Sequence, residues 1–227
     1  MTHIDFRSSQ RPTVGVEVEL ELIDPDTREL VSGANEILEG MRQANGDEHA
    51  KAKHELLQST IEIITGICQT AAEAHDDLAR TLTEVSEHAA RRGLVLMCSG
   101  THPFTNPATQ QISPHPRYLR LVEDMQWPAR QMQIFGIHVH VGVRSPEKAI
   151  AMVNALSFYI PHFLALSASS PYWIGADTGM ASWRSKVFEG LPTAGPPWQL
   201  SGWNQFERLM DTLISAKTIS TIREVWW

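Results

Sequence analysis

The 227-residue sequence lacks the features that mark several common classes of protein. It has only two cysteines, Cys68 and Cys98, which lie far apart in apolar surroundings, so we expect buried free thiols and neither a disulfide nor a zinc site. It has no run of about 18 apolar residues and no apolar stretch from Met1 to Pro12, which predicts a soluble, cytoplasmic protein. A Gly-rich Walker-type loop is also absent, which argues against a P-loop enzyme.

Basic runs are missing too, and the formal net charge is -7 at pH 7. This charge argues against nucleic acid or an anionic membrane as a partner, and we expect metal ions to mediate any contact with a phosphate ligand. A chain of this length buries roughly 70% of the surface that its unfolded form exposes, so a large core is available. We expect a single domain over residues 1–227.

The stretch Thr13–Leu22 alternates apolar residues with Gly15 and three glutamates. In a strand the apolar side chains point to one face, which we expect to be the core, and Glu17, Glu19 and Glu21 point to the other. One interpretation of this acidic row is the solvated outer face of an antiparallel sheet. The other is a cation site, because like charges about 7 Å apart repel one another and carboxylate oxygens are the preferred ligands of hard divalent cations.

Two further stretches carry candidate ligands. Thr60–Thr65 has the composition of a strand in which Glu62 lies among β-branched apolar residues, so this acid either faces water at a sheet edge or is paired or bound to metal. In the stretch over 133–143, strand periodicity places His138 and His140 side by side on one face. They are either a pair of metal ligands or two hydrogen-bonded histidines under a helix.

Hydrophobic periodicity and turn residues predict the remaining elements. In the first half we expect a strand over 29–31 that forms a hairpin with the first strand. A helix follows from its cap Ser32 to about residue 44, with Ile37, Leu38 and Met41 buried. A second helix is opened by a capping box of Thr70 and Glu73 and ended by Gly93, and a buried strand over 94–98 comes after it. In the second half we expect a helix over 117–133 that is interrupted near Pro128. A buried helix runs from its cap Ser145 to about residue 169 and is bent at Pro161. An irregular loop over 170–199, a helix over 203–215 and the start of a strand over 218–227 complete the chain.

These pieces suggest one site. The acids of the first strand, the isolated Glu62, the paired histidines and the long polar loop carrying Arg184 are consistent with a sheet whose concave face holds divalent metal. Mg or Mn with a phosphate ligand fits such oxygen-rich ligation, whereas zinc would take more nitrogen or sulfur.

The motifs also resemble those of the bacterial carboxylate-amine ligase family, also called glutamate-cysteine ligase type 2. The resemblance covers nearly the whole chain in order. It rests on Gly15-Val16-Glu17-Val18-Glu19, Glu62-Ile63-Ile64-Thr65, Gly100-Thr101-His102-Pro103, Phe135-Gly136-Ile137-His138-Val139-His140-Val141-Gly142, Ala165-Leu166-Ser167-Ala168-Ser169-Ser170-Pro171-Tyr172 and Asp177-Thr178-Gly179-Met180-Ala181-Ser182-Trp183-Arg184.

The resemblance implies an α+β, glutamine synthetase-like fold with a curved, mainly antiparallel sheet, helices packed on its convex face, and ATP and metals on its concave face. It implies ATP-dependent ligation of glutamate to cysteine or another amine through an acyl phosphate. The residue roles that it implies are metal ligation by Glu17, Glu19, Glu62 and His138, nucleotide binding by His138, Thr65 and Arg184, and catalytic roles for Arg184 and His140.

Members of this family continue beyond the stretch Ile222–Trp227. We therefore expect a chain that lacks its C-terminal part, has an incomplete active site and associates with itself to cover exposed apolar surface. Two alternatives remain open from the sequence. One is a metal-dependent hydrolase that uses His138, His140 and Glu62 with a bound water. The other is a non-catalytic binding or assembly protein.

Overall fold

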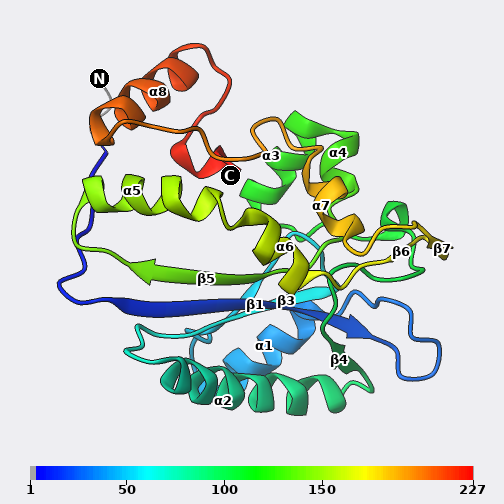
Figure 1. Ribbon diagram of the computed structural model, residues 1–227. Helices are drawn as coiled ribbons and strands as arrows, with labels where there is room; N and C mark the ends of the chain where they lie inside the picture. Colours follow the sequence, from blue (N-terminus) through cyan, green and yellow to red (C-terminus); the bar gives the residue numbers. More distant parts are fainter. Residues whose placement is uncertain (1–3, 227) are drawn as a thin grey trace. The chain divides into compact units, whose positions relative to one another are not determined.

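An antiparallel sheet centred on β1 (Thr13–Ile23) organises the computed structural model, which describes residues 4–226 (Figure 1). The strand order is β2-β3-β1-β4, and β5 also pairs with β1. The other strands of this sheet are β2 (Ala52–His54), β3 (Thr60–Ile64), β4 (Val95–Met97) and β5 (Ile137–Gly142). The first predicted strand is therefore the centre of the sheet, and three separate strands bring their residues to it.

Strand register decides which side chains meet across the sheet. Glu19 of β1 lies directly opposite Glu62 of β3, and Glu21 lies opposite Thr60 on one side and Met97 of β4 on the other. The predicted hairpin from residues 29–31 is reduced to one isolated bridge between Ile23 and Leu30. Residues 29–31 therefore add no strand to the sheet, and the strands that pair with β1 are β3, β4 and β5.

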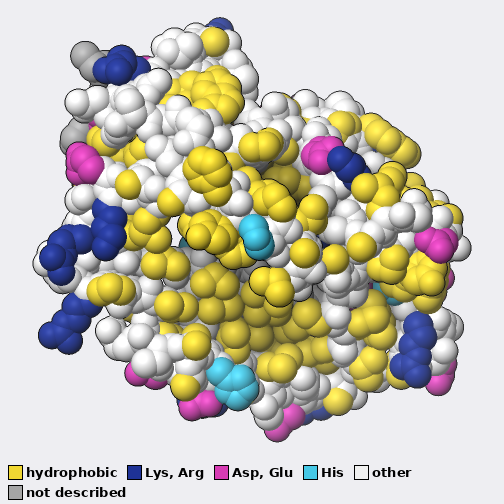
Figure 2. Space-filling view, in the orientation of Figure 1, with side chains coloured by type: hydrophobic (Ala, Val, Ile, Leu, Met, Phe, Trp, Pro, Cys, Tyr) yellow, Lys and Arg dark blue, Asp and Glu magenta, His cyan; other side chains and the backbone are white. Residues whose placement is uncertain are grey.

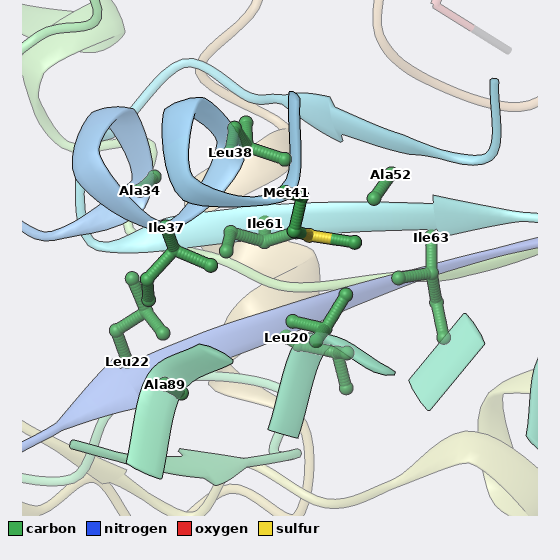
Figure 3. Close-up of a cluster of buried hydrophobic side chains, with 11 residues drawn as sticks. Leu20, Leu22, Ala34, Ile37, Leu38, Met41, Ala52, Ile61, Ile63 and Ala89 are labelled. Carbon is green, nitrogen blue, oxygen red and sulfur yellow. The ribbon is translucent and has the colours of Figure 1, made fainter. Parts of the chain in front are cut away.

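The helices α1 (Ala34–Asn45) and α2 (Ala71–Ala90) cover one face of this sheet (Figure 1). Between them and the strands lies a core of buried apolar side chains, most of which Figure 3 labels: Leu20, Leu22, Ala34, Ile37, Leu38, Met41, Ala52, Ile61, Ile63, Val85 and Ala89. The apolar residues of β1 and the buried side of α1 thus lie where the sequence predicts them. The helices and the mainly antiparallel sheet confirm the α+β class.

The predicted N-cap of α2, Thr70, is confirmed, and the Glu73 carboxylate reaches one residue further back than in a standard capping box. The Glu73 backbone N–H donates to the Thr70 hydroxyl at 3.1 Å, and the Glu73 carboxylate accepts from the backbone N–H of Gln69 at 2.7 Å. The predicted cap of α1 is wrong, because Gly33 rather than Ser32 is the N-cap and no side chain caps the helix. A side chain at Gly33 would lie 2.8 Å from Leu94, so close packing decides this position.

The segment predicted as an interrupted helix consists of α3 (Pro116–Met125) and α4 (Trp127–Arg130). They meet at Gln126, whose positive φ of 53° breaks the helix two residues before Pro128. The long irregular loop contains a hairpin of β6 (Tyr172–Trp173) and β7 (Ala176–Asp177), followed by α7 (Trp183–Phe188). Ile174 and Gly175 both have positive φ between the two strands, as a two-residue hairpin turn requires.

The chain divides into two compact units. One unit comprises Val14–His140 and Ala168–Val187, and it contains the core described above. The described residues of the other fall within Met1–Thr13, Val141–Ser167 and Phe188–Trp227.

In the second of these units the predicted long helix is two helices, α5 (Pro146–Ser157) and α6 (Ile160–Ser167). The break lies at Phe158 and Tyr159, so Pro161 occupies the first turn of α6, where its missing N–H costs nothing. The prediction of a buried helix is wrong, because Ile150 is the only buried side chain among the described residues of α5 and α6. Among residues 4–226 no single helix is long and apolar enough to cross a membrane, although this bent pair together passes the length and composition test.

The unit ends with α8 (Trp203–Ser215), which matches its prediction, and with a 3-10 helix, Ile222–Glu224, where the sequence predicts a strand. The Thr221 hydroxyl accepts from the Arg223 backbone N–H and caps this short helix. Residue 227 lies outside the described residues.

Both cysteines are free, as predicted, but Cys98 is exposed rather than buried because it follows the end of β4.

Candidate functional site

Three glutamates converge on the face of the sheet opposite the core. Ligand oxygens of Glu19, Glu55 and Glu62 lie within 4.8 Å of one another. Register places Glu19 of β1 beside Glu62 of β3, and Glu55 follows the end of β2. The sequence analysis misses Glu55, because it belongs to no periodic stretch and its place depends on the turn between β2 and β3.

Hydrogen bonds hold Glu55 toward the other two acids. One carboxylate oxygen accepts from the backbone N–H of Leu56 at 2.9 Å, and the other lies 3.3 Å from the Tyr118 hydroxyl. Burial and the neighbouring Glu55 are among the causes that raise the pKa of this tyrosine above its usual value. The start of α3 is therefore tied to the acidic cluster.

The electrostatics of the cluster are those of excess negative charge. Burial, followed by the charge of Glu55, raises the pKa of Glu19 to about 8. Burial, followed by the charges of Glu55 and Glu17, raises the pKa of Glu62 to about 7. Without a cation, the raised pKa values of Glu19 and Glu62 favour their protonated forms near neutral pH, first because burial disfavours the charged form and then because neighbouring acids repel it. A bound divalent cation would compensate this charge.

Gly136, just before β5, fixes the position of Glu19. Its backbone N–H donates to the Glu19 carboxylate at 2.7 Å, and its carbonyl oxygen accepts from the Glu19 N–H at 3.0 Å. A Cβ at this position would lie 3.0 Å from both Arg184 Nη2 and His138 Nε2. Glycine therefore lets one acid, one guanidinium and one imidazole approach the same backbone.

Arg184 reaches this place from the second residue of α7. Its Nε donates to the carbonyl oxygen of Phe135 at 2.9 Å, and its backbone N–H donates to the Ser170 hydroxyl at 3.1 Å. Burial lowers the pKa of the guanidinium, and the charge of Glu19 opposes this shift. A partly buried arginine next to a carboxylate cluster can bind a second anion if a cation occupies the acids.

A separate group consists of Glu17, His138 and His140. The Glu17 carboxylate lies 3.5 Å from His138 Nδ1 and 3.2 Å from His140 Nε2, because β5 runs alongside β1. Both imidazoles remain about half exposed (48% and 60%). The four predicted metal ligands are thus divided, with Glu19 and Glu62 in the acidic cluster and Glu17 and His138 beside it.

The other predicted site residue, Thr65, follows β3. Its hydroxyl accepts from the backbone N–H of Val16 at 2.9 Å and lies near Gly15 of β1. This contact joins the ends of the two central strands. The predicted role of Thr65 in nucleotide binding stays a prediction.

Glu21 shows that the acidic row of β1 is not a solvated face. It is fully buried, and the Ser99 hydroxyl donates to its carboxylate at 2.5 Å. Burial raises its pKa to about 7. It does not join the acidic cluster because its cross-strand neighbours are Thr60 and Met97 rather than further acids. The alternation of the strand therefore places three acids on one face, but the three have different surroundings.

His102 has a structural place in this unit. Its side chain is 1% exposed, its Nε2 lies 2.9 Å from the Arg28 carbonyl oxygen, and its Nδ1 accepts from the backbone N–H of Thr105. Burial lowers the pKa of the imidazole. The ring holds two loops together and has no free nitrogen for a ligand.

Comparison with known proteins gives a consistent result. The model of a family described as "Glutamate-cysteine ligase family 2(GCS2)" matches residues 13–227. A "Putative glutamate--cysteine ligase 2-1" of Frankia alni is 57% identical over 225 residues, which is 99% of this chain and 59% of that protein. A "Putative glutamate--cysteine ligase 2" of Thermobifida fusca is 52% identical, over 99% of this chain and 56% of that protein. The chain therefore spans somewhat more than half the length of these relatives.

Two solved structures share the fold. A bifunctional glutathione synthetase from Pasteurella multocida superposes with a TM-score of 0.67 at 15% identity, over 95% of this chain and 32% of that one. A glutamate-cysteine ligase from Francisella tularensis, solved in complex with AMP, gives a TM-score of 0.62 at 12% identity, over 93% of this chain and 49% of that one. At these identities the likeness establishes the fold alone.

Proposed function

Because the chain belongs to glutamate-cysteine ligase family 2, we propose that it acts in an ATP-dependent ligation of a glutamate carboxylate to the amine of cysteine or a similar compound. The observation that carries this proposal is the cluster of Glu19, Glu55 and Glu62 with Arg184 nearby. A phosphoryl-transfer enzyme needs divalent cations to neutralise phosphate oxygens, and a group of carboxylates is what such cations prefer.

Each residue then has a defined task. Glu19, Glu55 and Glu62 would hold Mg or Mn, which supplies charge neutralisation at the phosphate oxygens when bound. Arg184 orients a phosphate or a substrate carboxylate from the side of Phe135 and Gly136. Glu17 keeps His138 and His140 in place beside the cluster, where they can donate hydrogen bonds to phosphate.

The proposed reaction needs only these residue roles and no nucleophilic side chain. A carboxylate oxygen of glutamate attacks the γ-phosphorus of ATP, and the bond to the bridging oxygen of ADP breaks. The amine then attacks the acyl carbon, loses a proton, and displaces inorganic phosphate. The protein contributes position and electrostatic stabilisation to both steps. The substrates are small molecules, and the predicted self-association of the chain stays a prediction.

The test is thermal melting of the 227-residue chain with and without Mg-ATP. We expect Mg-ATP to raise Tm in the parent chain and not in Glu62→Gln, because the variant loses one oxygen ligand and one charge. Glu123→Gln is the matched control, since Glu123 is an exposed acid of α3 outside the cluster. ADP release with glutamate and cysteine measures whether the chain also turns over. An absent Tm shift in the parent chain would contradict the proposal and favour a non-catalytic binding or assembly protein.

The hydrolase alternative is not favoured. It needs His138, His140 and Glu62 around one metal, but both histidines contact Glu17 while Glu62 lies with Glu19 and Glu55. A preference for zinc over magnesium in the same melting experiment, with no effect of ATP, would reverse this order.

A further inference from the structure

A cavity of about 910 Å³ lies in the same unit as the acidic cluster, and none of the three clustered glutamates lines it. Its lining comes from α1, from the segment between α1 and β2, from β2 and from the start of α3. Its lining includes Lys53 and His54 of β2 and Arg117 and Tyr118 of α3. The volume is large enough for an amino acid or a nucleotide phosphate group.

The cavity borders the acidic cluster at two of its lining residues, Tyr118 and Lys53. The Tyr118 hydroxyl lies 3.2 Å from the His54 carbonyl oxygen and 3.3 Å from the Glu55 carboxylate, so one side chain belongs to both places. Lys53 lies directly opposite Glu62 in the register of β2 and β3. A ligand in the cavity would therefore lie next to the carboxylates.

The cations of the cavity differ in their partners. Arg42 donates two hydrogen bonds to the Glu39 carboxylate, at 2.7 and 2.6 Å, so its charge is already paired. Lys53 and Arg117, in contrast, form no ion pair with any carboxylate in the part of the chain that the structure describes. Their positive charges act on the cluster only at longer range, where they lower the pKa of Glu62 against the stronger opposing effects.

Exposed lysines and arginines are common on any surface, and most face water. Here two of them come from separate elements, β2 and α3, and line one cavity beside an acidic cluster. The hydrogen bonds of Tyr118 hold the start of α3 in this position. The same lining carries Glu39, which is paired with Arg42, and the acids Asp47 and Glu48. The oxyanion site is therefore confined to the part of the cavity next to Glu55 and Glu62, where Lys53 and Arg117 lie.

We propose that this cavity binds an oxyanion of a substrate, either an amino-acid carboxylate or a phosphate, through Lys53 and Arg117. The inference rests on the proposed function, because every substrate of such a ligase carries one of these groups. Lys53 and Arg117 are binding residues in this view. They hold the substrate beside the cluster of Glu19, Glu55 and Glu62, and they take no part in bond making.

The experiment is calorimetric titration of the full chain with L-glutamate, L-cysteine and inorganic phosphate, each without divalent metal. We expect at least one probe to bind. Lys53→Met and Arg117→Gln should each raise the Kd of that probe about tenfold, which is the effect of losing one charged hydrogen bond. Arg120→Gln is the matched control, because it removes the same charge from the same helix but lies outside the cavity lining. Binding of the amino acids but not phosphate would identify a carboxylate site, and the reverse result a phosphate site.

Two outcomes would overturn the inference: no binding of any probe to the parent chain, or binding that both cavity variants leave unchanged. Circular dichroism and melting of each variant show whether it folds. Because the titration contains no metal, it is independent of the Mg-ATP experiment. A Tm shift that Glu62→Gln abolishes, without oxyanion binding, would leave the proposed function standing and refute this inference alone.

Discussion

At the scale of the residue, Gly136 has more contacts with the site than its size suggests. It exchanges two hydrogen bonds with Glu19, and its missing side chain leaves room for Arg184 and His138. The role of Gly136 cannot be predicted from the strand-like sequence around it, because the side chains that surround it come from distant parts of the chain.

Replacement of Gly136 by alanine tests this role. The new Cβ would lie 3.0 Å from Arg184 Nη2 and His138 Nε2, so one of them must move. We expect a loss of about 1–3 kcal/mol in the free energy of unfolding and a smaller Tm shift with Mg-ATP. Gly202→Ala is the control for the added Cβ, which there meets nothing within 4 Å, so any loss reports only the N-cap of α8, where alanine is less favourable than glycine. An unchanged Mg-ATP shift in Gly136→Ala would mean that the side chains adjust without affecting the site.

At the scale of the element, α2 is held to the sheet edge by Asp77. This acid accepts hydrogen bonds from Lys51 Nζ at 2.5 Å, from the backbone N–H of Gly66 at 2.8 Å and from Arg80 Nη2 at 3.0 Å. Its side chain is only 9% exposed. One carboxylate therefore joins the helix, the start of the β2 segment and the loop after β3.

These contacts predict a pH dependence. The hydrogen bond from Lys51, followed by that from Gly66, lowers the pKa of Asp77 to about 2. A carboxylate whose folded pKa is below its unfolded value of about 3.9 stabilises the protein above that value, and the contribution disappears as the pH falls toward 2. We expect Asp77→Asn to cost about 1–2 kcal/mol at pH 7, after allowance for the partly exposed Lys51, and the two proteins to converge in acid. Urea unfolding at pH 7, 4 and 3 measures the difference, and a cost that does not fall with pH would contradict the ion-pair explanation.

The start of the same helix gives a second prediction. Thr70→Ala removes the hydroxyl that accepts from Glu73, so about 1 kcal/mol of unfolding free energy should be lost. Thr83→Ala, in the exposed middle of α2, should be neutral or slightly stabilising because alanine has the higher helix propensity. Urea unfolding compares the two, and equal losses would mean that the cap contributes nothing specific.

At the scale of the whole molecule, the candidate ligands belong to one of the two compact units. Glu19, Glu55, Glu62 and Arg184 all lie within Val14–His140 and Ala168–Val187, whereas α8 belongs to the other unit.

Outside the acidic cluster, part of the strand surface is apolar. Ile137 and Val139 of β5 are 64% and 63% exposed, and Figure 2 shows hydrophobic side chains gathered over the region where Figure 1 draws this strand.

The location of the candidate ligands in one unit predicts which elements metal binding stabilises. We expect Mg to slow amide hydrogen exchange in β1 and β3, because a cation that joins Glu19 and Glu62 resists separation of their strands. Exchange in α8 should change little. Glu62→Gln should remove the protection in both strands. Equal protection of all elements would mean that the cation acts on the chain as a whole and not through the cluster.

The sequence by itself determined the features that depend on neighbours along the chain. The alternation of β1, the cap of α2, the extent of α8 and the family membership follow from local periodicity, turn chemistry and motif order. Where long-range packing competes with a local signal the prediction is wrong, as with Ser32, which loses the cap of α1 to Gly33. The apolar composition of α5 and α6 also predicts burial wrongly, because composition does not specify what covers a helix, and Ile150 is the one buried side chain among their described residues.

Only the tertiary structure decided which acids meet. Glu17, Glu19 and Glu21 are equivalent in the pattern of β1, yet one lies with two histidines, one with Glu55 and Glu62, and one is buried against Ser99. The physical reason is that each position along a central strand has different partners on its two edges, and those partners come from distant parts of the chain. Local periodicity sets the face of a side chain, whereas strand pairing sets its neighbours and therefore its chemistry.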